Sequence, residues 1–321
     1  MSIGKRLFKQ REFMIFVIVV AMVIIMSLAS PHFLSRQNLL AVLLGLSIEA
    51  LIGVAMLNLM VSGGFDMSVG SVVGFTGASA AVLMRVGVPI PVAVLLAITA
   101  GACIGFFNGV LVAKIGINPF VTTLASLSLF RGLTLILTGG RNISPLPDAY
   151  NAIGQTQLFG VIQMPIIYML VFVILGDIML RKSRFFRQNY YIGGNDKSAR
   201  FSGIPVDKMK ILSFTLTGLF AGMAGLIMSS RLGTASTVAG TGLELRVITA
   251  VIIGGASLKG GEGTVFGAFL GSLLMAIIMN ALTLLQVDVY WHTFVIGATL
   301  LTAVLIDSIS KLRGDNKRTK G

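Results

Sequence analysis

The chain has 321 residues, of which 55% are hydrophobic and only 12% are charged, and its mean hydropathy is +0.92. A single soluble core cannot bury this much apolar surface, so the composition excludes a soluble globular protein and indicates a polytopic membrane protein. The net charge of +13 would suggest a nucleic-acid partner in a soluble protein. Here the basic residues cluster between apolar segments, where membrane topology explains them, so we expect no nucleic-acid partner.

Residue types that carry chemistry are sparse. The single cysteine, Cys103, lies in an apolar run and cannot form an intrachain disulfide, and His32 and His292 stand in surroundings poorly suited to a metal. No paired acids and no nucleophile next to a base are visible, so we expect neither a metal site nor catalytic residues.

The N-terminal segment, residues 1–12, is basic, with Lys5, Arg6, Lys9 and Arg11 ahead of an apolar run. Although Ser27-Leu28-Ala29 faintly resembles a signal-peptidase site, we interpret this run as an uncleaved first membrane span. A second basic segment, residues 310–321, ends the chain.

Between these segments, residues 13–309 form one predicted transmembrane domain. Its apolar runs are each close to the length of about 20 residues that crosses a bilayer core, except for a short eighth run. The predicted fold is therefore all-α, with about ten transmembrane helices. The runs lie at 13–30, 39–61, 67–85, 89–113, 117–138, 164–180, 211–230, 246–257, 264–285 and 291–309.

The charge distribution orients these spans. With ten spans and a cytoplasmic N-terminus, most of the 25 lysines and arginines fall on the cytoplasmic side, including those of residues 181–210. If one span before residues 181–210 were absent, this basic loop would lie on the external side of the membrane, against the charge rule. We therefore expect both termini in the cytoplasm.

Glycines mark turns and close helix contacts. The turn Ser62-Gly63-Gly64-Phe65-Asp66-Met67-Ser68 precedes the third span, and Asp66 is placed to cap that helix. Small residues four apart predict close packing between helices. These residues are Gly101, Gly105 and Gly109, then Gly218 and Gly222, then Gly263, Gly267 and Gly271.

The apolar spans are interrupted by five polar residues, namely Glu49, Asn58, Asn108, Arg131 and Asn280. A charged side chain within a span costs at least about 2.5–3.5 kcal/mol on insertion scales. Glu49, Asn58, Asn108 and Asn280, together with Asp66 of the turn, are our candidates for a translocation path. Helix–helix hydrogen bonding is the alternative, above all for Asn108 and Asn280. For Arg131 a structural clamp is the favoured interpretation, and complementary charge suggests the hypothesis that Arg131 pairs with Glu49.

The polar loop 181–210 contains a short predicted helix. Asn195 can accept a hydrogen bond from a free backbone N–H, and Asp196 suits the positive end of the helix dipole. Gly203 suits the left-handed position after a helix, and Pro205 cannot continue it. These signals predict a docking element of about two turns.

The run Gly254-Gly255-Ala256-Ser257-Leu258-Lys259-Gly260-Gly261-Glu262 superficially suggests a phosphate-binding loop. Gly-Glu follows Gly260 where a Walker A motif has Lys-Ser/Thr, so we interpret it as a turn between the eighth and ninth spans. If ATP drives this protein, the ATPase must be another chain.

Three motifs in this order resemble the ribose-type, carbohydrate-uptake permeases of bacterial ABC importers. They are residues 62–71, residues 193–204 and residues 251–261, and Val238-Ala239-Gly240-Thr241-Gly242-Leu243-Glu244-Leu245 adds a fourth. The resemblance covers about residues 38–309. The chain departs from the family pattern at Phe65 and at Glu49, where an amide or a small residue is common.

The resemblance implies a multi-pass permease of the bacterial inner membrane that imports a monosaccharide or a similar small polyol. Its implied partners are a second permease copy, a periplasmic substrate-binding protein, membrane lipid, and a cytoplasmic ATPase that binds ATP and Mg²⁺, so the permease itself needs no cofactor. It also implies that the loop helix couples to that ATPase. The implied coupling residues are Gly193, Gly194, Asn195, Ala199, Arg200, Ser202, Gly203 and Ile204.

Two alternatives remain open at this point. The same class of permease can carry a nucleoside, an amino acid or autoinducer-2. A secondary transporter driven by protons through Glu49 or Asp66 would also explain acids in broken spans, but it leaves the loop helix unexplained. No span shows the cluster of aromatic and polar residues typical of a sugar site, so we expect specificity to lie in the binding protein.

Overall fold

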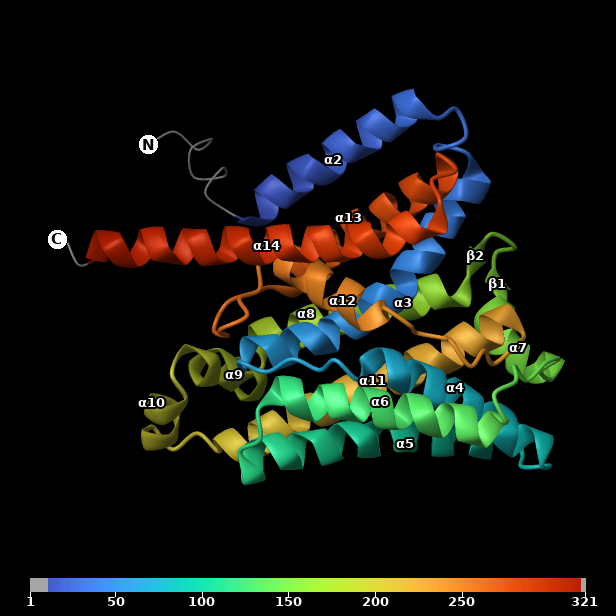
Figure 1. Ribbon diagram of the computed structural model, residues 1–321, viewed down its shortest axis with the longest axis horizontal. Coiled ribbons are helices and arrows are strands. Elements are labelled where there is room, and N and C mark those ends of the chain that lie inside the picture. The colour runs from blue at the N-terminus through green and yellow to red at the C-terminus, as the bar shows by residue number, and fades with distance from the viewer. Residues whose placement is uncertain (1–10, 319–321) are drawn as a thin grey trace.

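A computed structural model describes residues 11–318, which are almost entirely helical (Figure 1). The predicted basic N-terminus, residues 1–12, lies outside the described residues except at its last two positions. The side chains of the predicted basic tail, residues 310–321, also lie outside them. The fold class is therefore the one predicted from the sequence, an all-α polytopic membrane protein.

The described elements follow one another with short connections. Two residues of strand in each arm make a small antiparallel hairpin, in which Gln157 pairs with Gln163. The elements are α2 (Arg11–Ala29), α3 (Arg36–Val61), α4 (Val69–Arg85), α5 (Ile90–Val110), the π-helical turn η1 (Leu111–Ile115), α6 (Pro119–Thr138), α7 (Asp148–Gln155), β1 (Gln157–Leu158), β2 (Ile162–Gln163), α8 (Met164–Lys182), α9 (Arg184–Gly194), α10 (Asp196–Phe201), α11 (Val206–Leu232), α12 (Leu243–Ile253), α13 (Val265–Leu284) and α14 (Val289–Arg318).

Each predicted span corresponds to a helix. Among the described residues, 8 helices are long and apolar enough to cross a membrane. The other two predicted spans are shorter, since α4 has 17 residues and α12 has 11. Glycine-rich turns, which cannot extend a helix, border both of these short helices.

Helix α3 forms the centre of the bundle. Every residue from Leu46 to Val61 is buried, and α3 packs against α8, α11, α12 and α13. The sequence explains this position, because residues 46–61 have no polar face to expose. A helix that is hydrophobic all round is typically buried in a core.

The predicted glycine contacts are confirmed. Helices α5 and α11 pack so closely that a methyl group added at Gly105 would overlap the carbonyl oxygen of Phe214, and one at Gly218 would overlap that of Gly101. Likewise, a methyl group at Gly271 on α13 would overlap the carbonyl oxygen of Ala250 on α12. Only glycine permits these two pairs of backbones to touch.

The bundle has two distinct ends. In Figure 1, α9 and α10 lie at one end, where α2 also begins and α14 ends, and α7 and the hairpin lie at the opposite end. The start of α2 and the end of α14 thus both lie on the side of the basic loop, as the span count requires. Assigning that side to the cytoplasm remains a prediction from the charge distribution.

Candidate functional site

The loop helix α10 has the caps that the sequence predicts. Asn195 Oδ1 accepts a hydrogen bond from the Ser198 backbone N–H at 2.9 Å. At the other end Gly203 has φ +81°, and the Ile204 N–H donates to the Ala199 carbonyl at 3.1 Å. The helix is therefore a defined element with fixed ends, six residues long.

Charged side chains tie α10 to the start of α11. Asp196 accepts from Arg200 at 2.8 Å and from Lys210 at 2.5 Å, and Arg200 also pairs with Asp207 at 2.5 Å. Partial burial alone would raise the pKa of Asp196, but the hydrogen bonds from Lys210 and Arg200 outweigh it and hold that pKa below its ordinary value. From the sequence Asp196 was expected only to interact with the helix dipole, and its ion pairs with Arg200 and Lys210 were not predicted.

Three of the sequence motifs meet where α9 ends. The Gly261 N–H donates to the Val61 carbonyl at 2.8 Å. A methyl group on Gly193 would overlap the Val61 carbonyl oxygen, and one on Gly260 would lie 2.7 Å from the Gly193 Cα and 3.0 Å from the Gly63 Cα. Both glycine-rich turns thus pack directly on the end of α9, a contact that was not predicted from the sequence.

A buried polar cluster lies beneath this junction. Asn189 on α9 donates to Asn58 Oδ1 on α3 at 2.7 Å and to Ser213 Oγ on α11 at 3.3 Å. Asn58 also donates to Ser213 Oγ, at 3.0 Å. All three residues are buried, so a displacement of α9 would act directly on α3 and α11. Asn58 therefore belongs to this cluster.

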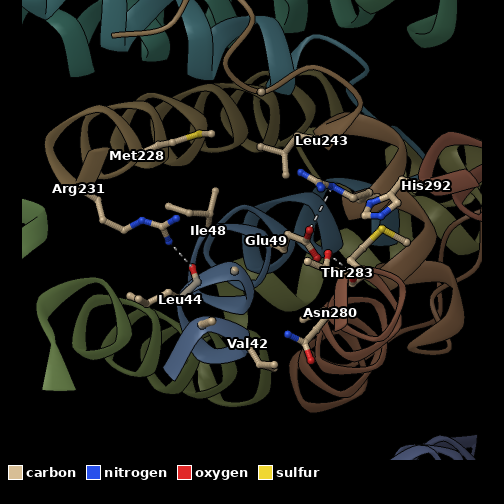
Figure 2. Close-up of a pocket in the computed structure, with 16 residues that line it drawn as sticks. Val42, Leu44, Ile48, Glu49, Met228, Arg231, Leu243, Asn280, Thr283 and His292 are labelled. Carbon is tan, nitrogen blue, oxygen red and sulfur yellow. Dashed lines mark hydrogen bonds and ion pairs between the residues drawn. The ribbon is translucent and has the colours of Figure 1, made fainter. Parts of the chain in front are cut away.

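A cavity of about 410 Å³ lies at the opposite end of the bundle, between α3, α11, α12, α13 and α14 (Figure 2). Its volume is in the range of small-molecule sites, about 300–1,000 Å³. Polar side chains from all five helices line it. They are Glu49, Arg231, Arg246, Asn280, Thr283 and His292.

Glu49 forms an ion pair at the cavity wall, but not with the predicted partner. Its Oε1 lies 3.1 Å from Arg246 Nε, and its Oε2 has no hydrogen-bond partner among the described residues. The hypothesis that Glu49 pairs with Arg131 is therefore wrong. Arg246 lies in the first turn of the short helix α12, which packs against α3, whereas Arg131 lies on α6 and has other partners.

Arg131 is a structural clamp, as favoured from the sequence. Its Nη1 donates to the carbonyl oxygens of Ala239 at 2.8 Å and Thr237 at 3.2 Å, and its Nη2 donates to that of Gly70 at 3.4 Å. These bonds hold the segment before α12 against α4 and α6.

The remaining path candidates lie in two different settings. Asn280 lines the cavity and exchanges two hydrogen bonds with Asn38, at 2.7 and 3.1 Å. Asn108, by contrast, is fully buried and joins Ser68 to Ser126 across α4, α5 and α6. It therefore supports helix packing.

Asp66 lies in the same buried network, but it is not the N-cap residue of α4 as predicted. The N-cap position lies two residues later. Asp66 Oδ1 accepts from both the backbone N–H and the hydroxyl of Ser68, at 2.7 and 2.6 Å, while Ser68 itself occupies the N-cap position of α4. Of the five path candidates, the structure places only Glu49 and Asn280 at the cavity.

Sequence reasoning missed four cavity residues. The sequence did not single out Arg231, Arg246 or Thr283, and His292 was considered only as a poor candidate for a metal ligand. The cavity combines residues from five helices, so no single segment reveals it. Among the side chains that the structure describes, those of residues 12–308, no group of three or more metal-binding residues comes together.

The apolar helices, with a capped polar loop at one end of the bundle and a cavity lined by polar side chains at the other, are features expected of an integral membrane transport protein. The chain belongs to the family described as branched-chain amino acid transport system, permease component, whose model matches residues 38–304.

Curated relatives resemble the chain along nearly its whole length. The ribose import permease RbsC of Haemophilus influenzae is 36% identical over 96% of this chain and 95% of its own. The autoinducer 2 import system permease LsrC of an Enterobacter strain is 34% identical over 94% and 88%. The xylose transport permease XylH of H. influenzae is 33% identical over 94% and 98%. No solved structure matches the chain.

The family and the apolar helices together show a multi-pass protein of the bacterial inner membrane. The predicted resemblance to ribose-type importer permeases is confirmed.

Proposed function

We propose that the chain is the membrane-spanning permease subunit of an ABC importer that carries a monosaccharide or a related small polyol. The observation that carries this proposal is the capped helix α10, joined to the bundle core by the glycine junction and the Asn189 cluster. This is the architecture that a transport subunit needs if a separate motor drives it. The family membership supports the same conclusion.

In this proposal α10 docks in a groove of a cytoplasmic ATPase, which binds ATP and Mg²⁺ and hydrolyses ATP. The coupling residues are those of the capped loop, from Gly193 to Ile204. Their roles differ in kind: Asn195 and Gly203 define the ends of the helix, Gly193 contacts the core, and Arg200 holds the helix to α11. A displacement of α10 by the ATPase is then transmitted to α3 through α9.

The proposed complex also contains a second permease copy and a periplasmic binding protein that delivers the solute. The named solutes of the relatives, ribose, xylose and autoinducer 2, are all small and rich in hydroxyl groups. The family description names branched-chain amino acids instead. Because the full-length relatives are importers of hydroxylated solutes, we favour that class, with an autoinducer-2-like molecule as the second candidate.

Reconstitution tests this proposal. The permease, its ATPase and its binding protein are placed in proteoliposomes, and uptake of radiolabelled D-ribose and D-xylose is measured with ATP and with a non-hydrolysable analogue. We expect uptake only with hydrolysable ATP, and none when residues 195–204 are scrambled. Uptake by the permease alone, driven by a proton gradient without ATP, would contradict the proposal.

A further inference from the structure

The cavity beside Glu49 has the chemistry of a solute site within a single permease chain. We propose that it binds a neutral solute bearing adjacent hydroxyl groups during passage, so that the permease itself discriminates between solutes. This inference rests on the proposed import function. It departs from the sequence-based expectation that specificity lies in the binding protein alone.

The unpartnered oxygen of Glu49 carries the argument. The residue is only 5% exposed, and Arg246 engages Oε1, whereas Oε2 has no partner among the described residues. Burying a carboxylate oxygen without a hydrogen bond is unfavourable in free energy, because the oxygen has lost its hydrogen bonds to water and has formed none with the protein. A hydroxyl group of a bound solute would supply the missing donor.

The opposite wall supplies donors. Figure 2 shows Arg231 on one side of the cavity and Glu49 and His292 on the other. The Arg231 guanidinium has five N–H donors, and its Nη1 donates to the Leu44 carbonyl oxygen at 3.2 Å. A hydroxyl both donates and accepts, so a solute with several hydroxyl groups can accept from this guanidinium and donate to the Glu49 carboxylate.

The cavity disfavours solutes that lack hydroxyl donors. A cationic solute would meet both Arg231 and Arg246, and an anion without hydroxyl groups would offer no donor to Glu49 Oε2. The Glu49–Arg246 pair nearly cancels at the wall, so a neutral solute gains hydrogen bonds on both sides without replacing either charge. Like charges brought together in a low-dielectric site are unfavourable.

The cavity is also mechanically connected to the docking loop. Glu49 and Asn58 lie on the same buried helix, α3, nine residues and about 13 Å apart along its axis. Asn58 bonds to Asn189 of α9, while Arg246 lies on α12. A shift of α3 relative to α12 therefore changes the Glu49–Arg246 spacing and releases the solute.

The test compares maximal uptake rates for two solutes in the complete reconstituted importer. D-Ribose and D-xylose differ in the orientation of one hydroxyl, and both are supplied at concentrations that saturate the binding protein. The variants are Glu49→Gln and Thr283→Val, and the control is Asp177→Asn, which removes a half-buried acid on α8 that pairs with Arg181 and does not line the cavity. The readout is the ratio of the two maximal rates.

We expect Glu49→Gln to lower the faster rate by roughly tenfold, the loss typical of a hydrogen bond to a charged group, and to bring the ratio towards one. Thr283→Val should reduce the ratio less, and Asp177→Asn should leave it unchanged. A structural defect alone would slow both solutes equally.

An unchanged ratio in both cavity variants would overturn the inference while leaving the import function intact. If Glu49→Gln fails to assemble, the Thr283→Val ratio decides alone. If the wild-type importer takes up neither solute with ATP, the proposed function fails instead, so the two failures are distinguishable.

Discussion

Asn189 Nδ2 donates a hydrogen bond to Asn58 Oδ1 at 2.7 Å, and this bond joins α9, the helix that leads into α10, to the central helix of the bundle. Both residues are buried, and Asn189 is fully so. Because Asn58 shares α3 with Glu49, one rigid element connects the surface where an ATPase would press to the cavity where a solute would sit. The first prediction follows from this connection.

Replacing Asn189 with leucine should uncouple ATP hydrolysis from transport. The substitution leaves the buried Asn58 carbonyl oxygen without its Asn189 donor, at a cost of about 1–3 kcal/mol. We expect a markedly lower number of solutes transported per ATP hydrolysed in proteoliposomes. Asn151→Ala is the matched control, since Asn151 bonds the Leu146 carbonyl far from α9. An unchanged ratio in Asn189→Leu would show that force reaches α3 by another route.

Gly203→Val should also uncouple the importer, through a different cause. No atom lies within 4 Å of a Cβ added at Gly203, so the effect comes only from its φ of +81°. A β-branched residue there costs about 1–2 kcal/mol or more, and the helix stop is lost. Gly203→Asn should be milder, because asparagine tolerates this conformation. ATPase activity and uptake are measured together; full uptake by an assembled Gly203→Val complex would refute the role given to this turn.

Gly105→Ala should destabilise the bundle. The added methyl group overlaps the Phe214 carbonyl oxygen, and overpacking of this kind typically costs about 1–3 kcal/mol. Gly132→Ala on α6 is the control, because no atom lies within 4 Å of its added methyl group. The melting temperature of the detergent-solubilised protein should fall for the first variant only. Equal melting temperatures would mean that α5 and α11 separate easily.

The ion cluster of α10 should survive mild acidification. The pKa of Asp196 lies below its ordinary value of 3.8, despite partial burial, because Lys210 and Arg200 donate to it. Its contribution to stability is therefore complete above the unfolded value and is lost only as the pH falls through the lower folded value. Hydrogen–deuterium exchange of residues 195–204, corrected for intrinsic rates, should show equal protection at pH 7 and pH 5. Asp196→Asn should lower protection at both values, and a loss in the wild type between them would contradict the assignment.

The sequence predicts most of the architecture because membrane spans and helix caps are local signals. Apolar runs locate the helices, Asn195 and Gly203 locate the ends of α10, and glycine spacing identifies the faces of α5 and α13. Each of these features depends on residues within one or two turns of one another. The short helices α4 and α12 are also visible as spans, although their true lengths are not.

The sites depend on contacts that no local pattern encodes. Glu49 stood out as an acid in a span, yet complementary charge pointed to Arg131, while the true neighbour is Arg246 on a different helix. The Asn58–Asn189 bond joins residues 131 positions apart. Likewise, Gly63, Gly193 and Gly260 belong to separate motifs whose contact appears only in three dimensions.

Co-purification tests the central claim, that the loop around α10 docks a separate ATPase, most directly. The tagged chain is isolated from its native membrane in mild detergent, and the accompanying proteins are identified by mass spectrometry, for the wild type and for a variant with residues 195–204 scrambled. The account predicts an ATP-binding-cassette subunit with the wild type and its loss from the variant, while the permease itself remains folded. An ATPase retained by the scrambled variant, or a wild-type chain that purifies alone and transports without ATP, would contradict it.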